Sequence, residues 1–132
     1  MRGWRILVVA FVSAALPLMA QAADCSNPVT QSDMTFCAGR DFAAAYKALN
    51  AAYLKARDQM RAIDADLPAD QRGAAAALLA AQKAWITFRD QACIAEGYTN
   101  HGGSIEPMVV AECQTRLTTA RTKDLTDLTA QN

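Results

Sequence analysis

The sequence has little of what several common functional sites require. It contains one histidine, His101, and four widely spaced cysteines, so it lacks the closely spaced ligand pairs of a zinc site, and we expect no metal. It has no glycine-rich phosphate-binding motif, and we expect no cofactor. Its 13 basic residues do not exceed its 13 acidic ones. This balance gives no basic footprint for nucleic acid, which we exclude as a partner.

Long apolar runs are also missing, except near the N-terminus. There, Arg2 and Arg5 precede an apolar stretch from Ile6 to Leu18, which is followed by small residues up to Ala22. This pattern predicts a secretory signal peptide over residues 1–22, cleaved after Ala22. A retained N-terminal anchor is the alternative. The apolar stretch is too short to favour a stable span, so we expect none after cleavage.

The remaining segment, residues 23–132, is predicted to form one domain. Its 110 residues (132 − 22) are enough for a single compact core and too few for two. Its net charge would be −2, because the first 22 residues hold two basic residues and no acidic one. An even number of cysteines in an exported chain indicates two disulfides, here among Cys25, Cys37, Cys93 and Cys113.

Helical spacing of apolar residues begins after Thr30 or Ser32, either of which can cap a helix. The pattern continues to about Asp64 and tolerates Gly39 at a cost of about 1 kcal/mol, so a local distortion there is an open possibility. Pro68 then interrupts it and predicts a short connection. The first helix should therefore span roughly thirty residues, or about 45 Å.

Two further helices are predicted. The second runs from about Asp70 to Glu96, with an alanine tract carrying it past Gly73. The third follows a Ser104 cap, with Pro107 in its first turn. Short connections favour antiparallel neighbours. We therefore predict an all-α fold, a small three-helix up-down-up bundle stapled by two disulfides.

In this topology all four cysteines come to the same end of the bundle. The sequence permits three pairings. We expect Cys93 with Cys113, which would close the glycine-containing loop, and Cys25 with Cys37, which would tie the lead-in to the first helix. A closed loop of about twenty residues should contribute around 3 kcal/mol to stability.

The segment from Gln82 to Cys93 has the clearest helical periodicity, and we expect it to form the central helix of the bundle. Trp85 and Arg89 lie one turn apart and can stack as a cation–π pair. Asp90 can pair with a basic residue of a neighbouring helix. We interpret these three residues as structural, and we place Phe88 on the adjoining apolar stripe.

The glycine-containing loop, residues 97–104, is the candidate binding feature. The three glutamates of the chain bracket it, and His101 lies within it. A histidine near a serine in such a loop is typical of turn chemistry, and a bundle this small seldom holds a sugar cleft, so we assign no catalytic residue and expect no enzyme. A solvated acidic rim is the plain alternative to a contact surface. The candidate partner-binding residues are Glu96, His101, Gly102, Gly103, Ser104, Glu106 and Glu112.

The ordered cysteines, together with Met34-Thr35-Phe36-Cys37-Ala38, Gln82-Lys83-Ala84-Trp85, Phe88-Arg89-Asp90 and Gly102-Gly103-Ser104, resemble the LprI-type lysozyme-inhibitor family. The resemblance covers nearly all of residues 23–132. It implies a secreted, disulfide-bonded helical domain with lysozyme as the partner to expect, and a periplasmic location in a Gram-negative source. It transfers no inhibitory residue, and the chain lacks the lipid-attachment cysteine of lipoprotein members.

Two functions from different classes follow. In the first, the held loop enters the cleft of a lysozyme while the glutamates steer the encounter. In the second, the protein is an envelope adaptor or structural binding module without lysozyme contact, and a partner would use the exposed side of the first helix. A small hydrolase is a third reading, which would require turnover lost on changing His101 or Glu106. The sequence does not predict the oligomeric state.

Overall fold

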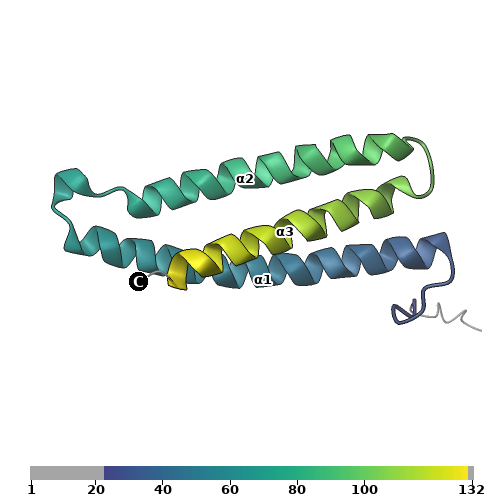
Figure 1. Cartoon of the computed structure of the whole chain (residues 1–132), viewed down its shortest axis with the longest axis horizontal. Coiled ribbons are helices and arrows are strands. Elements are labelled where there is room, and N and C mark those ends of the chain that lie inside the picture. The colour runs from purple at the N-terminus through teal and green to yellow at the C-terminus, as the bar shows by residue number, and fades with distance from the viewer. Residues whose placement is uncertain (1–22, 131–132) are drawn as a thin grey trace, which may run out of the picture.

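The computed structural model describes residues 23–130, and the predicted signal peptide at residues 1–22 lies outside this range. Three helices follow one another, α1 (Gln31–Asp66), α2 (Ala74–Gly97) and α3 (Glu106–Ala130). They run up, down and up beside one another (Figure 1). Two short 3-10 turns, Ala69–Gln71 and Tyr98–Asn100, lie in the connections, and residues 23–130 contain no strand. The predicted all-α three-helix fold is confirmed.

The start of α1 is fixed by a reciprocal cap. The Asp33 amide donates to the Thr30 hydroxyl (3.1 Å), and the Thr30 amide donates to the Asp33 carboxylate (3.2 Å). This capping box satisfies amides that a helix end would otherwise leave unpaired. The helix then continues for 36 residues without a break at Gly39, so the distortion left open there is absent.

The start of α2 differs from the prediction. The helix begins at Ala74, not near Asp70, because Gly73 is extended and acts as the N-cap residue. The amides of Gly73, Ala74 and Ala75 donate to the carboxylate of Asp64 at 2.9, 2.9 and 3.0 Å. The end of α1 therefore caps the start of α2. Alanine propensity did not carry the helix past Gly73, since these amides have a partner from outside the segment.

The start of α3 also lies later than the predicted Ser104 cap. The carbonyl of Ile105 accepts the amides of Met108 and Val109 at 3.0 and 3.1 Å, so Ile105 is the last residue before the helix. Ser104 is exposed and precedes this position. The carboxylate of Glu106, the first residue of the helix, accepts the amide of Gly102 in the preceding loop.

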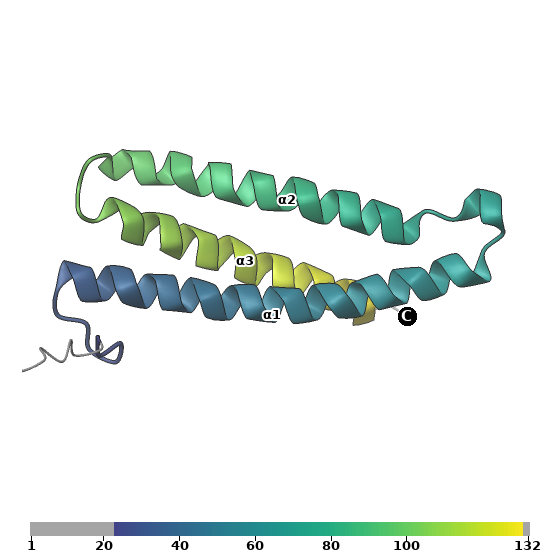
Figure 2. The ribbon, with the colours of Figure 1, turned by 180° about the vertical axis from the view of Figure 1, so that it is seen from behind.

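The prediction that α2 is the central helix is wrong. α3 shares the most extensive contacts with α1, whereas α1 and α2 contact each other least. Figure 1 shows α3 crossing in front of α1, and the reverse view in Figure 2 shows α1 in front. The physical reason is that α2 leaves Leu79, Phe88 and Ile94 exposed, Phe88 by 59%. Its apolar stripe is narrower than the sequence pattern suggested.

The apolar core lies mainly between α1 and α3. Leu49, Ala56, Leu78 and Leu125 form a buried cluster. Several half-buried side chains pack around it: Ala52, Tyr53, Met60, Trp85 and Leu128. At about 25 cal/mol per Å² of apolar surface, this burial is the main stabilising contribution to the fold.

Polar pairs hold α2 to α3. Arg121 donates to the side-chain oxygen of Gln82 (3.2 Å), and the Gln114 amide donates to Asp90 (3.4 Å). The Gln82 side chain is nearly inaccessible to solvent, so its polar atoms need partners within the protein. The α2–α3 contact therefore depends on matched polar groups as well as on apolar packing.

Both predicted disulfides are confirmed. Cys25 pairs with Cys37, and Cys93 pairs with Cys113, with Cα–Cα distances of 5.5 and 5.4 Å. The first bond ties the N-terminal lead-in to α1. The second joins the last turns of α2 to the first turns of α3 and closes a 20-residue separation, which should contribute about 3 kcal/mol through the unfolded state.

Candidate partner-binding end

The loop between α2 and α3 is held by close helix packing and by backbone conformation. A Cβ atom on Gly97 would lie 2.5 Å from Cγ2 of Val110, so only glycine allows α3 to approach α2 this closely. Gly102 has a φ of 77°, in the left-handed region that glycine adopts at low cost. The Gly103 amide donates to the Asn100 carbonyl (2.9 Å). The loop is therefore a set of defined turns.

Glu106 braces this loop from inside. Its carboxylate accepts the Gly102 amide at 2.8 Å and lies 3.2 Å from Nδ1 of His101. The Gly102 amide, and secondarily His101, lower the pKa of Glu106 below its ordinary value. The charge that was predicted to face a partner is thus engaged within the loop, although 26% of the side chain stays exposed.

The outer surface of the loop is a stacked aromatic pair. The rings of Tyr98 and His101 lie 4.6 Å apart, nearly parallel at 16°. Tyr98 is 60% exposed, and the His101 side chain is 64% exposed. Each ring restricts the other before any partner arrives. A preordered aromatic surface loses less conformational entropy on binding than a flexible one.

The other predicted residues lie at the same end but in different settings. Glu96 forms an exposed ion pair with Arg116 at 2.7 Å. Glu112 is exposed on α3 and lines a groove, of about 500 Å³, beside the Cys25–Cys37 disulfide. Ser104 borders a shallow hollow that also includes Phe36 of α1. The three glutamates therefore differ: one braces the loop, one is paired, and one lies along a groove.

Sequence reasoning missed the exposed apolar side chains of this end. Five large ones lie on or near the disulfide-bonded end, led by Val29 at 78% and Tyr98 at 60% exposure: Val29, Phe36, Ile94, Tyr98 and Ile105. Contiguous exposed apolar surface marks contact sites for other proteins. Tyr98 lies within the glycine-containing loop, and that position was the available signal for it.

Charge is distributed unevenly along the bundle. We call residues 23–41 and 89–116 the disulfide end, and the remaining residues 42–88 and 117–130 the distal end. The disulfide end has three basic and seven acidic residues, a formal charge of −4. The distal end has eight basic and six acidic residues, a formal charge of +2. The acidic surface is thus a property of one whole end and does not depend on the three glutamates alone.

The structural residues of α2 form a cation–π cluster. The guanidinium carbon of Arg89 lies 5.1 Å from the Trp85 ring, as predicted, and also 5.2 and 5.4 Å from the rings of Phe42 and Tyr46 on α1. Arg89 is only 5% exposed. Its guanidinium therefore occupies an aromatic cage at the junction of α1 and α2.

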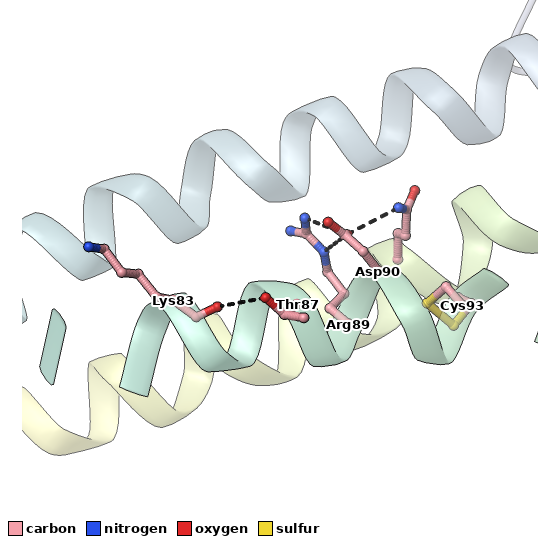
Figure 3. A network of polar contacts seen from close by, with 7 residues as sticks. Lys83, Thr87, Arg89, Asp90 and Cys93 are labelled. Carbon is pink, nitrogen blue, oxygen red and sulfur yellow. Dashed lines mark hydrogen bonds and ion pairs between the residues drawn. A yellow bond between two sulfur atoms is a disulfide. The ribbon is translucent and has the colours of Figure 1, made fainter. Parts of the chain in front are cut away.

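The expectation that Asp90 pairs with a basic residue of a neighbouring helix is wrong. Asp90 pairs with Arg89, the preceding residue of the same helix, at 2.8 Å, and its contact with a neighbouring helix is the amide of Gln114. Figure 3 shows these groups meeting on one side of α2, a turn before the Cys93 disulfide. The aromatic cage holds the Arg89 guanidinium beside Asp90, so Asp90 pairs with this cation and not with one from a neighbouring helix.

Neither a metal cluster nor a spanning helix is found in the described part of the chain. Residues 23–130 hold no group of three or more histidine, cysteine, aspartate or glutamate side chains arranged to bind a metal. The same residues form no helix that is both long and apolar enough to cross a bilayer.

Fold and site together define a small helical domain with two disulfides and an ordered, acidic end. The sequence profile described as "Lysozyme inhibitor LprI" matches residues 22–125. The chain belongs to this family. It is also similar to a protein of Rhizobium meliloti (strain 1021), named uncharacterized protein R02472, with 42% identity over 108 residues, which cover 80% of this chain and 78% of the relative. No solved structure matches the chain.

Proposed function

We propose that this protein binds and inhibits a lysozyme, and that the contact is made by its disulfide end. Family membership supports the target class. The observation that supports the location most directly is the exposed Tyr98–His101 stack, which rests on a loop braced by Glu106 and closed by the Cys93–Cys113 disulfide. We assign the protein to binding, with no catalytic step of its own.

The shape of the loop suits a cleft. Lysozymes cut between sugars with two carboxylates that flank the scissile bond. An inhibitor that blocks such a cleft needs a rigid group that occupies it in place of the sugar. The Tyr98 and His101 rings offer flat faces of the kind that contact sugars or aromatic side chains, and Nε2 of His101, which does not contact Glu106, offers a further polar contact.

The charge of the disulfide end supports a basic partner. Lysozymes of the animal type are basic, and the formal charge of −4 at this end would accelerate their association. Since Glu106 holds the loop in place, we assign long-range steering to the charge of the whole end. Glu96 and Glu112 can be substituted to test it without removing the contacts of Glu106. Glu96→Gln with Glu112→Gln should slow association and flatten its dependence on salt.

The test compares two exposed aromatic residues on either side of the Cys93 disulfide. Tyr98 is 60% exposed on the loop, and Phe88 is 59% exposed on the side of α2. We expect Tyr98→Ala combined with His101→Ala to weaken lysozyme binding by at least tenfold, or about 1.4 kcal/mol, as expected for hot-spot residues. Phe88→Ala should leave it unchanged. Binding is measured by interferometry, and inhibition by cell-wall lysis.

Equal affinity in the loop variant and the parent would refute the assignment of the contact to this loop. Equal losses in the loop variant and Phe88→Ala would point to a general effect of surface apolar area. Circular dichroism of each variant checks that the fold is intact, and the oxidation state is verified by mass spectrometry.

We further propose that residues 1–22 act as a cleaved signal peptide and that residues 23–132 reach the periplasm. Basic residues before a short apolar stretch and the small residues up to Ala22 support this processing. Two disulfides suit an oxidising compartment. Mass spectrometry of the exported product should give an N-terminus at Ala23. A cytoplasmic, full-length product would contradict the proposal.

A further inference from the structure

The exposed side of α1 in the distal end carries a stripe of basic residues. Lys47, Leu54, Arg57 and Arg61 are spaced by seven, three and four positions, so they lie along one face of the helix. Arg57 contacts the carboxylate of its neighbour Asp58 (2.8 Å). Among residues 23–130, Arg61 has no ion pair. We call these four residues the basic stripe.

A groove lies beside this stripe, between α1 and α2, the two helices that contact each other least. Its volume is about 390 Å³, and it combines two guanidinium groups and a tyrosine ring with an apolar wall. The lining residues are Tyr53, Arg57 and Arg61 of α1 and Ala75, Ala76 and Leu79 of α2. In Figure 2, α3 lies between α1 and α2 over most of their length, and α1 and α2 face each other near the connection that joins them. Two guanidiniums beside a tyrosine provide donors for an anionic group.

Exposed apolar side chains lie among these cations. Leu54 of α1 is 47% exposed within the stripe, and Leu79 of α2 is 45% exposed and lines the groove. A free anion or a highly charged polymer would gain nothing from them. A lipid surface would, because apolar side chains can enter the boundary between head groups and acyl chains while cations bind the head groups.

We propose that the basic stripe and its groove bind the surface of an anionic phospholipid bilayer. The distal end has a formal charge of +2 and the disulfide end −4, so the same surface attracts one end and repels the other. Of the acids near the stripe, Asp58 pairs with Arg57 and partly offsets its charge, and Asp64 is engaged by the first amides of α2. Among residues 23–130, Lys47 and Arg61 form no ion pair, so they carry the uncompensated positive charge of the stripe. The protein lies on the surface by its distal end.

This orientation has a functional consequence, which rests on the proposed function. The stripe lies along α1 in the distal end, and the Tyr98–His101 surface lies at the other end of the bundle, where an enzyme can reach it. Binding to lipid and binding to lysozyme then use opposite ends of the bundle. Loss of the first therefore leaves the second intact.

The experiment is flotation of the exported protein with vesicles. One set contains about one third phosphatidylglycerol in phosphatidylcholine, and the other contains phosphatidylcholine alone. We expect at least tenfold stronger partitioning to the anionic set. Arg57→Gln with Arg61→Gln should lower it by about 20-fold, since each basic residue near such a surface contributes roughly fivefold. Leu54→Ser with Leu79→Ser should also lower it.

A matched control removes two cations elsewhere. Arg40→Gln with Arg116→Gln changes the net charge equally, at two exposed positions of the disulfide end, and should lower partitioning less than threefold. Equal losses in both pairs would overturn the proposal, as would equal binding to neutral vesicles or none to either. Competition by millimolar inorganic phosphate at constant ionic strength would assign the groove to a small anion instead. Preferential binding of dextran sulfate would assign it to an anionic polymer.

Lysis inhibition in solution separates this proposal from the proposed function. The variant Arg57→Gln with Arg61→Gln should inhibit lysozyme as the parent does. Inhibition without vesicle binding overturns the membrane proposal alone. Vesicle binding without inhibition overturns the lysozyme proposal alone, and the basic stripe remains assigned to binding an anionic lipid surface.

Discussion

The carboxylate of Asp64, in the last turn of α1, accepts a hydrogen bond from the backbone amide of Ala75, in the first turn of α2 (3.0 Å). The same carboxylate accepts the amides of Gly73 and Ala74. One side chain thus satisfies three of the amides that a helix start leaves unpaired. These bonds, with Ala75 first, lower the pKa of Asp64.

Asp64→Ala should therefore release the start of α2. We expect faster hydrogen exchange at the amides of Ala74 and Ala75, together with fraying of the first turn, because no other side chain caps this helix. Asp66→Ala is the control, since this exposed residue belongs to the same turn of α1. Unchanged exchange in Asp64→Ala would show that the observed cap does not hold the helix start.

Glu106 makes the loop sensitive to acid. Its folded pKa is depressed, so its contribution to stability is fully present above the unfolded pKa and is lost as the pH falls through the lower folded pKa. We expect the Gly102 amide resonance to shift in this acidic window and the Tyr98–His101 stack to loosen. Glu106→Gln should lose that titration step, as followed by NMR. A Gly102 resonance that titrates alike in both proteins would contradict the assignment.

Alanine substitution at two helical glycines should change the free energy of unfolding in opposite directions. Gly97→Ala places a methyl group against Val110 and should lower the free energy of unfolding by about 1–3 kcal/mol. Gly39→Ala meets open space within α1 and should raise it by about 0.5–1 kcal/mol. Chemical denaturation measures both. Equal effects would mean that the close approach of α2 and α3 is not a stabilising feature.

Arg89 should be the most sensitive charged residue of the bundle. Arg89→Ala removes the contacts with three rings and leaves Asp90 without its cation, so we expect a loss of about 2–4 kcal/mol in the free energy of unfolding. Arg89→Lys should lose about 1–2 kcal/mol, because an ammonium group does not stack on the rings. Arg40→Ala, at an exposed ion pair, should change less than about 0.5 kcal/mol. A similar change in Arg40→Ala and Arg89→Ala would contradict this ranking.

The sequence predicted the parts of the fold that depend on local patterns. The Thr30 cap and the course of α1 follow from residues close together in the chain. The two disulfides were preferred because the up-down-up topology brings the cysteines to one end. The start of α2 was misplaced since its cap, Asp64, lies on another helix.

The details of the site could not be predicted in the same way. The loop and its surrounding glutamates were recognised from composition, but the different settings of Glu96 and Glu106 depend on distances between helices. The exposure of Phe88 depends on how far α2 turns from its neighbours, which the width of an apolar stripe does not fix. The cage around Arg89 combines Phe42 and Tyr46 of α1 with Trp85 of α2, which lies 43 and 39 positions away from them.

The most direct test of the central claim is titration of the oxidised, exported protein into a lysozyme cell-wall lysis assay, with a reduced and alkylated sample as control. Reduction breaks the Cys93–Cys113 disulfide that closes the loop. We predict dose-dependent inhibition by the oxidised protein and its loss after reduction. Absence of inhibition by the oxidised protein across several types of lysozyme would contradict the claim, and would favour an envelope adaptor that uses the exposed side of α1.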